Sequence, residues 1–163
     1  MSLGLPNAAI RSWPKPCSQG YASYLNFLHS SSHLVILPHK LSTISIMSTT
    51  ILQSADESHV SKACQTYSIT TTQFHALHSR SRDAKATAYC PYSQFRVGAS
   101  ILTEDGHYID GANVENASYP VGTCAERVAF GKAVTDGHRK FRAIAVATDI
   151  SPPASPCGMC RQL

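Results

Sequence analysis

Two segments decide the fold of this chain: Thr123-Cys124-Ala125-Glu126-Arg127 and Ser155-Pro156-Cys157-Gly158-Met159-Cys160-Arg161-Gln162. Together they hold three thiols and one carboxylate, more chemistry than any other part of the sequence. Cys124 opens a helical stretch for which Thr123 is the expected N-cap. Cys157 and Cys160 follow a proline at a spacing of three, which predicts a helix start with both sulfurs on one side. We therefore expect two helix starts to meet at one site.

The three cysteines predict a catalytic metal site rather than a structural one. Zinc with three protein ligands keeps its fourth position for water, and no fourth Cys or His follows at a useful spacing. Glu126 lies beside this ligand set, where a carboxylate can move protons between water and a substrate. Other interpretations stay open for both elements. The Cys-x-x-Cys could be a redox pair or half of a structural zinc site. Glu126 could be a solvated acid in the first turn of a helix.

The pattern resembles the cytidine deaminase family. Zinc deaminases combine His-Cys-Cys or three Cys ligands with a Glu that is not a ligand and a Pro-Cys-x-x-Cys signature. Two more segments resemble the nucleoside-binding parts of that family, in the same order, and the resemblance runs from Phe74 to Leu163. They are Tyr89-Cys90-Pro91-Tyr92-Ser93-Gln94-Phe95-Arg96-Val97-Gly98-Ala99 and Asn113-Val114-Glu115-Asn116-Ala117-Ser118-Tyr119-Pro120.

The resemblance implies roles for these residues. Phe95 is expected to pack on the pyrimidine ring, Asn113 and Glu115 to bind the ribose hydroxyls, and the Ala125 amide to meet the pyrimidine carbonyl. As alternatives, Phe95 could be a core residue of a strand, and Asn113 and Glu115 could be ordinary polar residues of a turn. The rest of the sugar-lining loop consists of Val114, Asn116, Ala117, Ser118 and Tyr119.

Arg127 is the expected partner of the metal ligands. Three thiolates on Zn²⁺ carry a net charge of −1, which weakens the metal as a Lewis acid. Arg127 lies three residues after Cys124 on the same helix face and resembles the family arginine that hydrogen-bonds the ligand sulfurs. A surface arginine is the alternative.

The hydrophobic pattern predicts an α/β fold, a three-layer αβα sandwich around a mixed sheet. Asp105-Gly106 is a strong hairpin signal between two strands. The strand, helix and strand that follow imply a parallel crossover. The expected elements are a helix after Thr70 that ends at Pro91, strands 96–103 and 108–114, a helix 124–135, a strand 142–147 and a helix starting at Cys157.

We expect residues 1–69 to be an extension and residues 70–163 to be the catalytic domain. The first 55 residues are Ser-rich without Asp or Glu, which is compatible with a mitochondrial transit peptide, although a disordered extension or a start at Met47 are alternatives. The apolar run Leu34–Leu37 is too short to span a bilayer. Cys17, Cys64 and Cys90 lack disulfide spacing, so a reducing compartment, the cytoplasm, is expected.

Family members continue beyond the Cys-x-x-Cys segment with two strands and a helix, and they form homotetramers. Because this chain stops at Leu163, we expect its sheet to lack its last strands, the apolar strand 142–147 to become an exposed edge, and the chain alone to have little or no activity.

Charge argues against a polymeric substrate. Three of the four net positive charges come from Arg11, Lys15 and Lys40, so the rest of the 163 residues is nearly neutral, which does not favour nucleic acid.

The expected reaction is zinc-dependent hydrolysis of cytidine and deoxycytidine to uridine and deoxyuridine, in pyrimidine salvage. Deoxycytidylate and polynucleotide deaminases usually present His-x-Glu where this chain has Cys124-Ala125-Glu126, and blasticidin deaminases differ at Asn113–Tyr119. An inactive zinc-binding fragment that associates with full-length subunits is the alternative from another class.

Overall fold

The computed structural model describes residues 23–27, 32–36, 51–52, 56–150 and 154–163. In this part of the chain, one six-stranded sheet has the order β3-β1-β2-β6-β4-β5. Its strands are β1 Ser23–Phe27, β2 Ser32–Ile36, β3 Ile51–Leu52, β4 Val97–Thr103, β5 Tyr108–Ala112 and β6 Phe141–Thr148. The helices are α1 Glu57–Tyr67, α2 Thr71–Ala84 and α3 Ala125–Thr135, with short 3₁₀ turns at Lys85–Thr87, Tyr119–Val121 and Cys160–Gln162.

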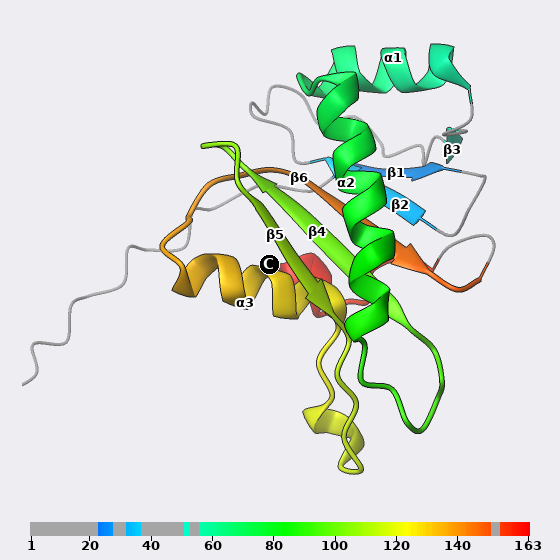
Figure 1. Ribbon diagram of the computed structural model, residues 1–163, viewed down its shortest axis with the longest axis vertical. Coiled ribbons are helices and arrows are strands. Elements are labelled where there is room, and N and C mark those ends of the chain that lie inside the picture. Colours follow the sequence, from blue (N-terminus) through cyan, green and yellow to red (C-terminus); the bar gives the residue numbers. More distant parts are fainter. Residues whose placement is uncertain (1–22, 28–31, 37–50, 53–55, 151–153) are drawn as a thin grey trace, which may run out of the picture.

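The sheet is covered by helices on both faces (Figure 1). Side chains of a strand alternate between the two faces, and β6 shows this directly. Ala143 and Ala145 belong to a core cluster with residues of α1 and α2. Ile144 and Val146 belong to a second cluster with residues of α3. This alternation confirms the three-layer αβα sandwich that the sequence predicts.

The hairpin and the crossover also form as predicted, with one difference. The turn between β4 and β5 contains Asp105 and Gly106, and Gly106 has a φ of 90°, which a glycine adopts without strain. Both β5 and β6 pair antiparallel with β4, so they run parallel to each other, with β4 between them. The sheet is mixed because β1 and β3 form its parallel pair in the described residues.

Two glycines let the helices approach the sheet closely. A Cβ on Gly98 of β4 would lie 2.2 Å from the Ser81 carbonyl oxygen of α2. A Cβ on Gly111 of β5 would lie 2.5 Å from the Ala129 amide nitrogen of α3. Each helix backbone therefore rests directly on strand backbone.

The expectation that strand 142–147 lies at an exposed edge is wrong. In the structure β2 pairs antiparallel with β6 from Ser32↔Ala147 to Ile36↔Ala143, so β6 has a neighbour on each side. The apolar run near Leu34, which is too short for a membrane span, is used as a strand instead. Pairing between segments so far apart in the chain leaves no local signal in the sequence.

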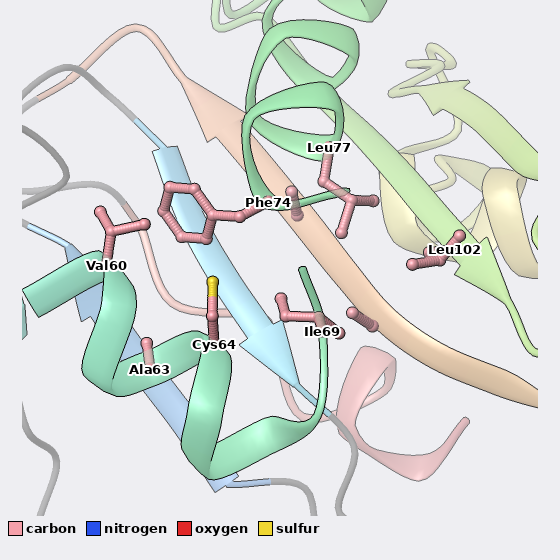
Figure 2. Close-up of a cluster of buried hydrophobic side chains, with 9 residues drawn as sticks. Val60, Ala63, Cys64, Ile69, Phe74, Leu77 and Leu102 are labelled. Carbon is pink, nitrogen blue, oxygen red and sulfur yellow. The ribbon is translucent and has the colours of Figure 1, made fainter. Parts of the chain in front are cut away.

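Order begins before Thr70, where the sequence pattern places the first helix. Helix α1 starts at the N-cap Asp56, whose side chain accepts hydrogen bonds from the amides of Ser58 and His59. Figure 2 shows Val60, Ala63 and Cys64 of α1 in one buried cluster with residues of α2 and β4. The first 69 residues thus contribute a helix to the core.

Helix α2 has the capping box that its start predicts, with Thr70 and Gln73 bonded to each other's backbone. It ends at Ala84 instead of continuing to Pro91, and Lys85–Thr87 forms a 3₁₀ turn. The predicted face is buried as expected, at Phe74, Leu77, Ser81 and Ala84.

Most of the segment with transit-peptide composition, including Cys17 and Met47, lies outside the described residues. Among the helices that the structure describes, none is long and apolar enough to cross a bilayer.

Candidate active site

Cys124 is fixed at the start of α3 by a short backbone pairing. Thr123 and Val114 exchange amide–carbonyl hydrogen bonds of 2.8 and 2.9 Å directly before the helix. Cys124 itself, not Thr123, occupies the N-cap position of α3. The first of the three cysteines therefore lies where the loop after β5 returns to the sheet and the crossover helix begins.

Cys157 and Cys160 lie in a tight turn after β6, which corrects the expected helix start. The Arg161 amide donates to the Cys157 carbonyl at 3.2 Å, and a 3₁₀ turn follows from Cys160. Arg161 Nε also donates to the Pro156 carbonyl at 2.9 Å. This turn still brings the two cysteines to the same side, since their sulfurs lie 3.4 Å apart.

The three sulfurs converge. Cys124 Sγ lies 3.7 Å from Cys157 Sγ, which lies 3.4 Å from Cys160 Sγ, and all three are within 4.8 Å of one another. A tetrahedral zinc with Zn–S bonds of about 2.3 Å requires sulfurs about 3.8 Å apart. Figure 1 shows the C-terminal turn beside α3, as this grouping requires. The donor set fits a zinc ion with one position left for water.

The environment of the three thiols favours the binding of a cation. Burial raises the pKa of the Cys124 thiol and, more strongly, that of Cys160. The pKa of Cys157 is lowered, first by a hydrogen bond from the Cys160 backbone. Three thiolates this close repel one another, and a divalent ion that binds all of them compensates the charge.

Glu126 is buried beside this cluster, in the first turn of α3, with 6% of its surface exposed. Its charge contributes to the raised pKa of both Cys124 and Cys160, so the carboxylate lies near both sulfurs. A buried carboxylate needs a compensating partner, which a metal ion at the three sulfurs would provide. Ala125, which lies between Cys124 and Glu126 in the sequence, is fully buried.

Arg127 joins α3 to the turn before it. Its Nη2 donates to the Gly122 carbonyl at 2.7 Å. Its Nε is buried and has no hydrogen-bond partner within the described residues. The bond from Arg127 to the ligand sulfurs therefore stays a prediction, with an unused donor available for it.

Asn113 and Glu115 organise the loop that carries Phe95, which is partly buried. Asn113 Oδ1 accepts from the Val97 amide at 2.8 Å, and its Nδ2 donates to the Phe95 carbonyl at 2.9 Å. Glu115 accepts from the amides of Tyr92 and Ser93 at 3.0 and 3.2 Å. It also accepts from the Ser93 hydroxyl, the main reason why its pKa is lowered.

Ser93 is a residue to which the sequence analysis assigns no role. Its hydroxyl donates to Glu115 and accepts from the Phe95 amide at 3.0 Å, so it connects the two predicted substrate residues. The signal in the sequence that could have predicted this role is a serine in a loop, since a serine hydroxyl often bonds the backbone amide two residues further on and stabilises a turn.

The remainder of the predicted sugar loop is mostly exposed. Asn116 Oδ1 accepts from the Ser118 amide at 2.8 Å and tightens the turn. Tyr119 is 89% exposed at the start of a 3₁₀ turn. Val114 and Ala117 are exposed as well. The structure thus brings Phe95, Asn113 and Glu115 together by hydrogen bonds, while residues 116–119 project outward.

Comparison with known proteins identifies this arrangement. A family model described as the cytidine and deoxycytidylate deaminase zinc-binding region matches residues 71–163, more than half of the chain. The chain belongs to this family. The match includes the three cysteines, Glu126 and the Phe95 loop, so the zinc that the sulfur geometry fits is also the metal of the family.

Individual relatives agree with the family assignment. Cytidine deaminase of Sporosarcina psychrophila is 53% identical over 87 residues, which are 53% of this chain and 64% of that protein. Cytidine deaminase of Halalkalibacterium halodurans is 54% identical over 80 residues, 49% of this chain and 61% of that protein. The chain thus spans less than two thirds of the length of these relatives.

A solved structure supports the fold as well. The crystal structure of cytidine deaminase from Burkholderia pseudomallei is 49% identical and superposes with a TM-score of 0.53, covering 54% of this chain and 71% of that one. The α/β sandwich is therefore that of the deaminase fold.

Proposed function

We propose that this protein catalyses the zinc-dependent hydrolytic deamination of cytidine and deoxycytidine to uridine and deoxyuridine, with release of ammonia, as a step of pyrimidine salvage. The observation that carries the proposal is the convergence of three cysteine sulfurs next to the buried carboxylate of Glu126. Cytidine deaminases are the relatives that support this substrate class.

The residues would divide the work as follows. Cys124, Cys157 and Cys160 would hold zinc, which supplies Lewis-acid activation of the hydrolytic water. Glu126 carries a proton first to pyrimidine N3 and then to the departing amine, as a general base and acid must at two steps. The buried backbone at Ala125 offers an amide to the pyrimidine carbonyl oxygen.

The Phe95 loop would orient the nucleoside. An aromatic face is a suitable platform for a base, and Phe95 is held between Ser93 and Asn113 by hydrogen bonds. Glu115 and Asn113 retain unused acceptor and donor capacity beyond their loop contacts, which can reach the ribose hydroxyls. Residues Val114, Asn116, Ala117, Ser118 and Tyr119 would line the sugar, and Arg127 would hydrogen-bond the ligand sulfurs.

Assembly into a homo-oligomer, a tetramer by resemblance to the family, is part of the proposal. Large apolar side chains are exposed on the loops around the site, and we expect contacts between subunits to cover them. They are Tyr89, Tyr92, Tyr119, Val121 and Met159.

A cytoplasmic location is part of the proposal too, with mitochondrial import if residues 1–55 act as a transit peptide. Fluorescent fusions with and without residues 1–55 test this.

The decisive experiment is an assay of the purified, zinc-analysed protein with cytidine, deoxycytidine and deoxycytidylate, following absorbance and ammonia. We expect turnover of both nucleosides and little of the nucleotide, and no turnover by Cys124→Ala. A zinc-loaded protein without activity would support the alternative of an inactive fragment, and preference for the nucleotide would overturn the substrate assignment.

A further inference from the structure

A second group of potential metal ligands lies outside the cysteine cluster. Asp105 Oδ2 lies 3.1 Å from His107 Nδ1 and 3.2 Å from His138 Nδ1, and the three ligand atoms are within 4.8 Å of one another. We propose that Asp105, His107 and His138 form a binding site for a divalent transition-metal ion of the zinc class, separate from the catalytic one.

The site lies at the other end of α3 from the cysteines. Asp105 and His107 belong to the hairpin between β4 and β5, and His138 to the connection from α3 to β6, both at the left in Figure 1. Cys124 caps the start of α3, and His138 follows its end. An 11-residue helix is about 16 Å long, so one ion cannot serve both clusters.

The backbone on the hairpin side is fixed without any metal. The buried hydroxyl of Thr103 accepts from the His107 amide at 2.9 Å and donates to the His107 carbonyl at 3.2 Å. The Glu104 amide donates to the Lys140 carbonyl at 3.0 Å, which ties the hairpin to the connection after α3.

The backbone on the helix side is fixed too. Gly137 has a φ of 99°, and the His138 amide donates to the Ala133 carbonyl at 3.0 Å, the six-to-one bond of a Schellman motif. The His138 side chain is only 18% exposed. A ligand set held on ordered backbone loses little conformational entropy on binding, which favours affinity.

The donor chemistry suits a borderline ion. Two imidazoles and one carboxylate are ligands for Zn²⁺ and its neighbours, whereas Ca²⁺ and Mg²⁺ prefer all-oxygen sites. Bonds of about 2.0 Å in a tetrahedron place the ligand atoms about 3.3 Å apart, close to the two N–O distances observed. Three protein ligands leave a position for water.

The basic side chains next to this site interact with other groups. The Arg139 guanidinium donates to the carbonyls of Val134 and His138. Lys140 pairs with Glu104 at 3.7 Å. The carboxylate of Asp105 thus remains the charged group that faces both imidazoles, and an ion bound there would link the hairpin to the connection after α3.

The first test counts zinc. Protein already loaded at the cysteines is dialysed against micromolar free zinc, and metal is measured by elemental analysis. We expect two zinc ions per chain in the wild type, one in His107→Ala, and two in the matched control His75→Ala, which removes an exposed histidine of α2. One zinc in the wild type, or two in His107→Ala, would overturn the proposal.

A second test guards against unfolding of the variant. Asp105→Asn keeps a hydrogen-bond acceptor for the histidines but loses the charged ligand. In protein already loaded at the cysteines, added zinc should raise the melting temperature of the wild type by a few degrees and that of Asp105→Asn by much less, since only a bound ion stabilises the native state. Equal rises in both proteins would contradict the site.

Discussion

Glu115 holds Ser93 by both of its donors: the Ser93 amide donates to Oε2 at 3.2 Å and the hydroxyl donates to Oε1. The residue that sequence reasoning assigns to the ribose is therefore already bonded to the loop that carries Phe95. We therefore expect substrate binding and loop order to be coupled through this carboxylate.

Glu115→Gln should weaken cytidine binding without removing zinc. The amide cannot accept from all three loop donors as a carboxylate does, so the loop loosens and KM should rise about tenfold or more while the metal ligands are untouched. Steady-state kinetics with zinc analysis measures both. The exposed Glu57→Gln is the control, and an unchanged KM in Glu115→Gln would show that the loop does not depend on this carboxylate.

Much of the fold follows from local signals in the sequence. The Asp105-Gly106 turn fixes the β4–β5 hairpin, the apolar period of α3 defines the crossover helix, and the alternating strands require cover on both faces. Three cysteines and a glutamate next to predicted strand ends were enough to predict one shared site. The elements follow from residues near each other in the chain, whereas the shared site follows from motifs 33 residues apart whose chemistry belongs together.

The parts that sequence reasoning missed depend on long-range pairing or on fine geometry. No pattern within β2 specifies that it pairs with β6 rather than with another strand. Cys157 and Cys160 lie in a tight turn that leads into the 3₁₀ turn Cys160–Gln162, not in a helix, a difference that their spacing cannot distinguish. Ser93 acquires its role from Glu115, which lies 22 residues further along the chain.

Gly98→Ala should destabilise the protein, whereas Gly131→Ala should stabilise it. The Cβ at Gly98 meets the Ser81 carbonyl oxygen of α2 at 2.2 Å and the Lys85 amide nitrogen just after α2 at 2.7 Å, so the helix must shift, at a cost of about 1 to 3 kcal/mol. At Gly131, within α3, nothing lies within 4 Å, and alanine in a helix gains about 0.5 to 1 kcal/mol. Urea denaturation of both variants checks the opposite signs; a shift in the same direction would refute the packing argument.

The contribution of Asp149 to the stability of the folded protein should be lost in acid. Lys85 and Arg96 bind this carboxylate at 2.8 and 2.9 Å, and the hydrogen bond from Lys85 is the largest reason why its pKa lies below the ordinary 3.8. A lowered folded-state pKa stabilises the protein above the unfolded pKa and loses that effect as pH falls through the folded one.

Asp149→Asn should therefore melt below the wild type at neutral pH, and the gap should close below about pH 4. Melting curves across pH measure this. Asp136→Asn, at an exposed carboxylate, is the control, and a gap that stays constant into acid would show that the ion pairs contribute nothing.

Cys124→Ala should lose the catalytic zinc. Two remaining thiolates cannot hold an open site with comparable affinity, because each ligand contributes to binding and to the geometry. Elemental analysis after dialysis against zinc-free buffer, in a His107→Ala background that removes the second proposed site, gives the stoichiometry. Cys90→Ala, outside the cluster, should keep its zinc, and a Cys124→Ala protein with one zinc per chain would exclude Cys124 as a ligand.

Glu126→Gln separates proton transfer from metal binding. Glutamine keeps the size of the buried side chain but cannot accept a proton, and deamination needs proton movement at two steps, so turnover should fall by about 10² to 10⁴-fold. Zinc content should stay unchanged, because Glu126 lies beside the three sulfurs without being one of the ligands. Paired measurement of kcat and zinc, with Glu57→Gln as control, distinguishes the outcomes. A fall of less than about tenfold would mean that another group moves the proton, whereas loss of zinc would mean that the carboxylate belongs to the ligand set.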